Sequence, residues 1–364
     1  MSEEMYMDKY MMNSHKLLWH LDRVTSWLKG ERVVPLHMDI GISKGCTIGC
    51  VYCYGVNQGR VGPKGFYIPR EPLIRFMRDA AEVGVKAISI TGEAEPTMNP
   101  AVYEAVLEGN RAGLSIGLAT WGGTIKKNKF SELAENLVWI RFNISAGDEE
   151  NYQKIHRTVK ENFKKVIRNI ERFVELKTQS NLPITIGLQM VMMPWYAQES
   201  IKLAKLGKEI GVDYLEIKHC SDTYDGKIGV GFEDYQNIID ILKEAESMTT
   251  DTYNVIVKWN KILAGRERNY DICYGAGNFM LRMSGDGVIF PCAQFFDFRS
   301  EEFAIGNIME NSFKDLFYSK KYLETLKRIQ RLNVHKECYS GCKENAINEF
   351  LWLLRNSPPH LNFI

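Results

Sequence analysis

Three cysteines within residues 46–53, CTIGCVYC, have the spacing of a metal-binding loop. Cys46, Cys50 and Cys53 form the pattern C-x-x-x-C-x-x-C directly after an apolar, strand-like run. Cysteine is the usual ligand of iron–sulfur clusters, and a four-iron cluster normally takes four cysteines. Because only three are local, the fourth iron would be open to a small molecule, as one position of a catalytic zinc site is. Zinc or simple burial of the thiols is the alternative, but zinc sites prefer paired C-x-x-C motifs.

The same loop resembles the signature of the radical S-adenosylmethionine (SAM) enzymes, including the aromatic Tyr52 before the last cysteine. The resemblance implies a [4Fe–4S] cluster whose open iron binds the amino and carboxylate groups of SAM. It further implies cleavage of SAM to a 5′-deoxyadenosyl radical, which abstracts a hydrogen atom from the substrate. An external electron donor such as flavodoxin or ferredoxin would reduce the cluster.

Further contacts with SAM are expected where two later strands end. In TGEAEPTMNP, residues 91–100, the resemblance to a Gly-Gly-Glu-type motif implies that Gly92 and Glu95, or in second place Glu93, hold the SAM amino group. The alternative is a strand-to-helix turn with exposed acids. Related enzymes bind the SAM ribose and carboxylate near SAGDEENYQKIHR, which implies Ser145 and Arg157. Arg157 is equally well interpreted as a surface or helix-pairing residue.

Cys220 stands apart from the other cysteines, at the end of the sixth expected strand. A lone buried cysteine usually acts as a small apolar side chain. Some radical SAM epimerases, which this chain resembles in plan, use such a thiol to donate a hydrogen atom to the substrate radical. We therefore carry both interpretations of Cys220 forward.

A second group of cysteines lies near the C-terminus. Cys273 and Cys292 flank an expected hairpin, with strands 279–284 and 288–292 joined by Gly285-Asp286-Gly287. Together with Cys338 and Cys342 they can fully ligate a second cluster. The arrangement resembles the SPASM/Twitch extension of radical SAM enzymes and implies one auxiliary [4Fe–4S] cluster. Zinc is again the alternative.

Alternating strand-like and helix-like segments must position these residues. The strand candidates are 36–43, 85–91, 114–121, 138–145, 184–192 and 212–220. Helix-like segments between them, such as 159–180, predict an α/β fold with parallel strands and helical crossovers, a partial (β/α)6 TIM-like barrel. A small C-terminal auxiliary-cluster domain of a β-hairpin plus helices would follow it.

The strand pattern also predicts which side chains face the barrel interior. Period-2 alternation places the following polar residues inward: Ser89, Thr91, Arg141, Asn143, Ser145, Thr185, Gln189, Glu216, Lys218 and Cys220. A closed barrel fills its interior with branched apolar residues. So many polar groups therefore favour an open barrel with a solvated cleft, and the cysteine loop 44–56 lies at the strand ends where barrel enzymes place their chemistry.

We predict four parts: an N-terminal helical extension (1–35) with an amphipathic helix over 14–30, the partial barrel (36–250), the iron–sulfur domain (251–345), and a C-terminal helix and tail (346–364). The net charge of +1 gives no global reason to expect nucleic acid or an anionic membrane. No apolar run reaches the roughly 18 residues of a membrane span, and no signal peptide is evident. We expect a cytoplasmic protein, and eight cysteines there favour metal or redox chemistry over disulfides.

Three functions fit these features. The first is a radical SAM oxidoreductase or epimerase that abstracts hydrogen from a C–H of a small, carbohydrate-like substrate. Only about 35 residues precede the first strand, too few for a separate peptide-recognition domain. The second is a maturase or epimerase of a ribosomally synthesised peptide. The third is a non-catalytic iron–sulfur or zinc protein that senses redox state or binds partners.

Overall fold

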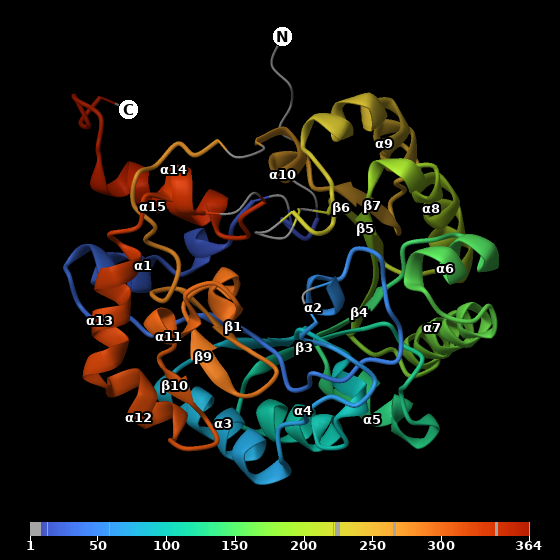
Figure 1. Ribbon diagram of the computed structural model, residues 1–364, viewed down its shortest axis with the longest axis horizontal. Coiled ribbons are helices and arrows are strands. Elements are labelled where there is room, and N and C mark those ends of the chain that lie inside the picture. Colours follow the sequence, from blue (N-terminus) through green and yellow to red (C-terminus); the bar gives the residue numbers. More distant parts are fainter. Residues whose placement is uncertain are drawn as a thin grey trace.

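One curved sheet forms the centre of the molecule (Figure 1). The computed structural model describes residues 9–12, 14–57, 59–220, 222, 226–264, 267–338 and 341–363. Within these residues the sheet has ten strands in the order β10-β9-β8-β1-β2-β3-β4-β5-β6-β7. The strands are β1 (His37–Ile40), β2 (Ala87–Ile90), β3 (Ser115–Thr120), β4 (Trp139–Asn143), β5 (Thr185–Met192), β6 (Tyr214–His219), β7 (Asn254–Val257), β8 (Met280–Met283), β9 (Val288–Phe290) and β10 (Gly306–Asn307).

The six predicted barrel strands are confirmed as β1 to β6, and each pairs in parallel with the next. The sheet ends at β7 on one side and at β10 on the other, so the barrel is open, as its polar interior predicts. The predicted hairpin is confirmed as the antiparallel pair β8 and β9.

Two features of the sheet were not predicted. β7 extends the barrel beyond β6 in parallel, with Tyr214 opposite Asn254. The hairpin is also not a separate layer, because β8 pairs in parallel with β1 through His37 and Met280. The hairpin strands therefore continue the same sheet as the barrel strands, so one sheet carries both cysteine groups at its edges and loops.

Helices connect the strands and surround the sheet (Figure 1). The α-helices are α1 (Leu21–Leu28), α2 (Tyr54–Asn57), α3 (Arg70–Val83), α4 (Val102–Arg111), α5 (Phe130–Asn136), α6 (Glu149–His156), α7 (Glu161–Gln179), α8 (Glu199–Ile210), α9 (Ile239–Glu246), α10 (Trp259–Ala264), α11 (Ser300–Phe303), α12 (Phe313–Tyr318), α13 (Lys320–Ile329), α14 (Val334–Glu337) and α15 (Asn345–Arg355). Short 3-10 helices are η1 (Leu17–Trp19), η2 (Pro96–Met98), η3 (Lys127–Lys129), η4 (Pro194–Tyr196), η5 (Glu233–Ile238) and η6 (Ala293–Phe296). The long predicted helix over 159–180 is confirmed as α7.

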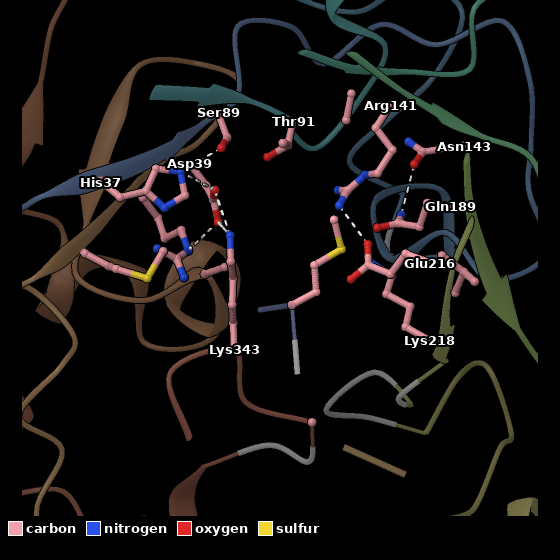
Figure 2. Close-up of a pocket in the computed structure, with 18 of the residues that line it drawn as sticks. His37, Asp39, Ser89, Thr91, Arg141, Asn143, Gln189, Glu216, Lys218 and Lys343 are labelled. Carbon is pink, nitrogen blue, oxygen red and sulfur yellow. Dashed lines mark hydrogen bonds and ion pairs between the residues drawn. The ribbon is translucent and has the colours of Figure 1, made fainter. Parts of the chain in front are cut away.

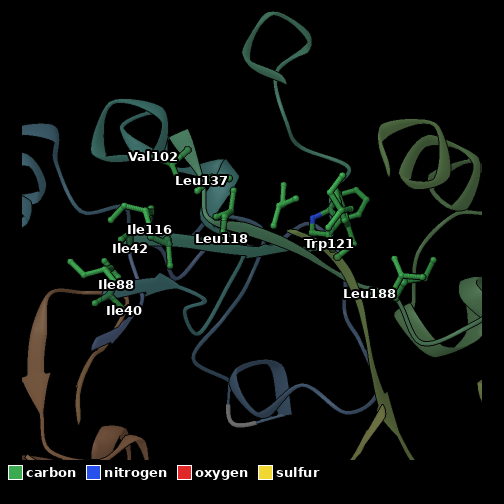
Figure 3. Close-up of a cluster of buried hydrophobic side chains, with 14 of the residues drawn as sticks. Ile40, Ile42, Ile88, Val102, Ile116, Leu118, Trp121, Leu137 and Leu188 are labelled. Atoms are coloured by element: carbon green, nitrogen blue, oxygen red, sulfur yellow. The ribbon is translucent and has the colours of Figure 1, made fainter. Parts of the chain in front are cut away.

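The main core lies between the sheet and these helices (Figure 3). Ile40, Ile88, Leu118 and Leu188 point outward from neighbouring strands and are at most 1% exposed. Burying a side chain of this size stabilises a fold by about 1.5–3 kcal/mol. Since the apolar face of each strand is used for this packing, the opposite, polar face is left to line the interior.

The two ends of the chain pack together beside this core. The predicted first helix is shorter than 14–30, because the chain forms η1 and then α1, with His20 between them. Val24 and Trp27 of α1 share a buried cluster with Leu351 of α15 and Phe279. The Arg355 guanidinium lies 4.5 Å from the centre of the Trp27 ring. No helix within the described ranges is both long and apolar enough to cross a bilayer.

Candidate active site

A cavity of about 1090 Å³ lies inside the open barrel. Pockets for small molecules typically have volumes of roughly 300–1,000 Å³, so this one has room for a cofactor and a substrate together. The predicted inward residues that line it are Ser89, Thr91, Arg141, Asn143, Thr185, Gln189, Glu216, Lys218 and Cys220. The register inferred from period-2 alternation is therefore confirmed for every predicted residue except Ser145.

Cys46, Cys50 and Cys53 all line this cavity. Their loop is held in place by backbone bonds: the Cys46 N–H donates to the Gly62 carbonyl at 2.9 Å, and the Val51 N–H donates to Ile155 at 2.9 Å. Burial raises the pKa of the Cys46 thiol to about 12, and the neighbouring Cys53 contributes to that rise. A bound metal group would stabilise the thiolates instead, and three cysteine thiols lining one cavity are the donor types of an iron–sulfur cluster. Within the described residues, no three such side chains are close enough to hold a single metal ion as they stand. It is the donor types that fit the predicted cluster.

His156 touches the cysteine loop and was not identified from the sequence. Its Nδ1 lies 3.1 Å from the Cys50 sulfur, and its Nε2 accepts a hydrogen bond from the Ser145 N–H at 3.0 Å. Burial lowers the pKa of His156 to about 3, so the ring is neutral. Because Nε2 is an acceptor, the single ring proton is on Nδ1 and points at Cys50. No local spacing could reveal this contact, since 106 residues separate the two partners.

Tyr52 and Gly92 border the same opening. Tyr52 lines the cavity, and its ring packs edge-on against His156 with centroids 5.8 Å apart. Gly92 has φ +36°, and a Cβ at this position would lie 3.1 Å from the Gly41 Cα. Glycine is therefore required for the backbone to turn at the end of β2.

The two acids of the 91–100 loop already have protein partners. Glu93 pairs with Arg60 and also accepts a hydrogen bond from the Gly285 N–H of the hairpin turn at 2.5 Å. Glu95 is 3% exposed. Its carboxylate accepts hydrogen bonds from the Thr97 N–H and hydroxyl, the Thr120 hydroxyl and the Trp121 N–H. The predicted alternative of exposed acids in a simple turn is wrong, because both carboxylates are buried. Their contact with SAM stays a prediction.

Ser145 and Arg157 lie away from the cavity surface. Ser145 is fully buried, and its hydroxyl accepts a hydrogen bond from the Val191 N–H at 3.2 Å. Arg157 is exposed and ends α6 in the left-handed conformation, with φ +46°. Neither is among the cavity-lining residues of the described chain, whereas Arg141 on β4 is. The ribose and carboxylate contacts of Ser145 and Arg157 therefore stay predictions without geometric support.

Cys220 directly follows β6 and lines the cavity. Its sulfur lies 4.0 Å from the Tyr52 carbonyl oxygen, so it is next to the cysteine loop. Its N–H lies 3.0 Å from the Tyr235 hydroxyl, and the same hydroxyl donates to the Cys220 carbonyl at 2.8 Å. Burial raises the pKa of the Cys220 thiol to about 12, so the sulfur keeps its hydrogen at neutral pH.

The four C-terminal cysteines converge on a second, small pocket. Cys273, Cys292, Cys338 and Cys342 all line it, although the chain between the first and the last of them includes the β8–β9 hairpin, η6, β10 and helices α11 to α14. Burial raises the pKa of Cys273 and Cys292, and Cys342 contributes to both shifts. Four thiols around one pocket fit the complete ligand set of a cluster. Cys342 also lines the central cavity, so the two spaces adjoin.

Two charged clusters face each other across the cavity (Figure 2). On one wall Asp39 accepts from Lys343 at 2.7 Å and lies 3.4 Å from Arg282, which also pairs with the buried Glu344. On the other wall Arg141 pairs with Glu216 at 2.8 Å. The sequence indicated that Arg141 and Glu216 face inward. It did not identify Asp39, Arg282 or Lys343 as residues of the cavity. These latter contacts join β1 to distant parts of the chain: Arg282 follows Asp39 by about 240 residues and Lys343 follows it by 304.

Two protein-family models match segments of this chain. The family model of the radical SAM superfamily matches residues 40–206, and that of an iron–sulfur cluster-binding domain, SPASM, matches residues 273–344. An AdoMet-dependent heme synthase of Methanosarcina barkeri is 23% identical over 331 residues, which cover 84% of this chain and 90% of that protein.

Two solved structures share the fold. Streptococcus suis SuiB bound to S-adenosylmethionine superimposes with a TM-score of 0.65 at 17% identity, covering 94% of this chain and 80% of that chain. Native anSMEcpe with bound AdoMet gives a TM-score of 0.57 at 18% identity, covering 90% of this chain and 99% of that chain. Identities this low show a common architecture.

Proposed function

Because this chain belongs to the radical SAM superfamily and carries a C-terminal SPASM iron–sulfur domain, we propose that it oxidises a C–H group of a small, carbohydrate-like substrate in the central cavity. We assign Cys46, Cys50 and Cys53 to the SAM-binding [4Fe–4S] cluster. We assign the four cysteines of the second pocket to an auxiliary [4Fe–4S] cluster. When bound, these groups supply the electron that cleaves SAM and an acceptor for the electron that the substrate loses.

The protein's own residues position the substrate between the two cysteine groups. Oxidation of a secondary alcohol to a ketone would remove a carbon-bound hydrogen atom, a hydroxyl proton and one electron. Bound SAM would supply the acceptor of the hydrogen atom, solvent in the open cavity would take the proton, and the auxiliary cluster would take the electron. Cys342 lines both the central cavity and the second pocket. This adjoining position is the observation that carries the proposal, because it gives the departing electron a short path to the auxiliary site.

Anaerobic reconstitution tests the assignment of cofactors. Two four-iron clusters would give about eight irons per chain, and dithionite with SAM would release 5′-deoxyadenosine. A colourless, zinc-loaded protein would contradict the cluster assignment. A protein that binds iron but never cleaves SAM would support the alternative of a non-catalytic redox sensor.

Epimerisation through Cys220 is the second candidate reaction. In this reaction the substrate radical takes a hydrogen atom from a thiol on its opposite face. Cys220 lines the cavity and keeps its hydrogen at neutral pH, which is the form that a donor requires. Its sulfur lies next to the cysteine loop, near the carbonyl of Tyr52.

We expect Cys220→Ala to separate epimerisation from oxidation. If the thiol donates, product formed in deuterated buffer carries one solvent deuteron at the inverted carbon, and Cys220→Ala stops product formation while 5′-deoxyadenosine is still released. Cys220→Ser is the matched control, because a hydroxyl O–H does not donate a hydrogen atom readily to a carbon radical. Mass spectrometry of the product provides the measurement. Product without deuterium, formed equally well by Cys220→Ala, would leave oxidation as the reaction.

A peptide is the alternative substrate. One solved structure with this fold is SuiB bound to the precursor peptide SuiA, with a TM-score of 0.65. Comparing metabolites and modified peptides between cells with and without the gene would decide between the two substrate classes. We further propose a cytoplasmic enzyme reduced by flavodoxin or ferredoxin, a location that agrees with eight cysteines free of disulfides.

His156 is expected to influence the cluster held by Cys50. Hydrogen bonds to ligand sulfurs favour the reduced, more negative state of a cluster. His156→Phe removes the Nδ1 proton that points at Cys50, so the reduction potential should become more negative. Potentiometric titration followed by EPR measures this change. An unchanged potential would show that the contact has no electronic role, whatever the effect on activity.

A further inference from the structure

One wall of the cavity carries an unusual concentration of positive charge. Arg141 on β4, Lys218 on β6, Lys258 after β7 and Lys261 on α10 all line the cavity around Glu216. Arg141 lies 2.8 Å from one carboxylate oxygen of Glu216, and the Lys258 ammonium lies 3.8 Å from the other. Figure 2 shows Arg141, Glu216 and Lys218 together on this wall. We call these four cations and Glu216 the cationic wall.

The charges of the cationic wall do not cancel. Although burial raises the pKa of Glu216, Arg141 and the three lysines together lower it to about 2, so the carboxylate is ionised. Counted over these five side chains, four cations around one carboxylate leave an excess of three positive charges when every lysine is protonated. Asp222, near Cys220, also lines the cavity and reduces the excess to two. Within the described chain, neither the Lys218 nor the Lys261 ammonium nitrogen lies within 4.0 Å of a carboxylate oxygen, the longest distance of an ion pair.

The opposite wall shows what a balanced cluster looks like in this cavity. There Arg282 and Lys343 are matched by Asp39 and Glu344. Two cations and two carboxylates pair at close range. The Asp39 cluster is therefore balanced, whereas the β4–β6–α10 side carries more cations than carboxylates.

This excess works against the stability of the free protein. Burial and then the charge of Arg141 lower the pKa of Lys218 to about 8. Burial and then Lys218 lower the pKa of Lys261 to about 7. Lowered values mean that the protein disfavours the charged ammonium groups in their present surroundings. A buried group of like charges held against repulsion is typical of a site that receives an oppositely charged ligand.

We propose that Lys218, Lys258 and Lys261 bind a phosphate group of the substrate. The three ammonium groups suit a phosphate, because lysine binds phosphate as a point charge. A planar carboxylate is better matched by the two parallel N–H groups of an unpaired arginine. The only arginine of the cationic wall is already paired with Glu216. A phosphate monoester carries about −1.5 to −2 charges at pH 7, which offsets most of the excess.

The position of the lysines agrees with chemistry at a nearby carbon. Cys220 follows Lys218 by two residues and lines the same cavity, so the two side chains share one face about 7 Å apart along the strand direction. Lys261 lies near enough to Cys342 for their charges to interact. A phosphate held here places the adjoining carbons of a small molecule between Cys220 and the second cysteine group. This inference rests on the proposed function, which places the substrate in the central cavity. It identifies the substrate class as phosphorylated metabolites.

Calorimetric titration of the reconstituted, SAM-bound enzyme with inorganic phosphate and pyrophosphate tests the subsite. We expect one site per chain, and Lys218→Met and Lys261→Met should each weaken binding by about tenfold or more. Lys205→Met is the matched control, because Lys205 is exposed on the outer helix α8, and it should bind like the unaltered enzyme. Succinate, a dicarboxylate, should bind more weakly than phosphate. Equal phosphate affinity in all variants, or tighter binding of succinate, would overturn the proposal.

Two further measurements separate a ligand site from a structural role. The unfolding midpoints of Lys218→Met and Lys261→Met should equal or exceed that of the unaltered enzyme, because each removes a repelled, buried charge. A clear drop in the midpoint would show that the lysines stabilise the fold or compensate the charge of the auxiliary cluster. SAM affinity should not change, and a parallel loss of SAM and phosphate binding would assign the lysines to the SAM carboxylate instead.

A failure of the phosphate subsite and a failure of the proposed reaction can be told apart. Reductive cleavage of SAM, assayed on the same preparations without substrate, tests the radical chemistry alone. Phosphate binding without SAM cleavage would contradict the proposed function and leave the subsite standing. SAM cleavage without phosphate binding at Lys218 and Lys261 would overturn the phosphate subsite and leave the proposed function standing.

Discussion

Cys53→Ala is expected to abolish SAM cleavage and to reduce the iron content from about eight to about four per chain. Cys53 lines the cavity together with Cys46 and Cys50, and the 46–53 loop holds no fourth cysteine to replace it. The substitution removes only the thiol, because the loop is held by backbone bonds from the Cys53 N–H to Cys50 and from the Asn57 N–H to Cys53. Release of 5′-deoxyadenosine with dithionite and SAM, alongside iron analysis, measures the effect.

Cys338→Ala is the matched control for this loss. Cys338 lines the second pocket, so its removal should also cost about four irons. SAM cleavage should continue, while oxidation of the substrate should stop for lack of an electron acceptor. Loss of SAM cleavage in Cys338→Ala, or its survival in Cys53→Ala, would show that the two cysteine groups are assigned the wrong way round.

Local patterns in the sequence predicted the barrel and its polar interior well, because alternation along a strand is a local property. The faces of Arg141, Asn143, Gln189 and Glu216 followed from their neighbours alone. β7 was not predicted; it lies at the edge of the sheet and pairs only with β6 among the described strands. The pairing of β8 with β1 joins segments about 240 residues apart, and no local pattern specifies such a partner.

Cysteine spacing predicted both metal-binding groups, since ligands of one cluster occur in recognisable intervals. Contacts made by side chains were harder to predict, because their partners come from other elements. Arg157 has a polar side chain in the expected region, but the left-handed end of α6 leaves it exposed. The cationic wall gathers residues from β4, β6 and α10, which only the folded chain brings together.

Glu95→Ala is expected to destabilise the enzyme by several kcal/mol, because each buried donor left without its acceptor costs about 1–3 kcal/mol. Its carboxylate accepts hydrogen bonds from Thr97, Thr120 and Trp121, and these buried donors would be left without a partner. The bonds to Thr120 and Trp121 tie the end of β2 to the end of β3. The Glu95 N–H also donates to the Gly45 carbonyl at 3.0 Å, which connects this junction to the cysteine loop.

Urea denaturation of the holoenzyme measures the loss, with Glu135→Ala as the control. Glu135 is exposed on α5, and its removal should change stability by no more than about 0.5 kcal/mol. Glu95→Gln distinguishes the protein role of this carboxylate from a SAM contact. The amide keeps the shape but turns an NH2 group toward donors, so the urea midpoint should fall between those of the alanine variant and the unaltered enzyme. An unchanged midpoint with weakened SAM binding would show that the carboxylate serves the cofactor rather than the junction of β2 and β3.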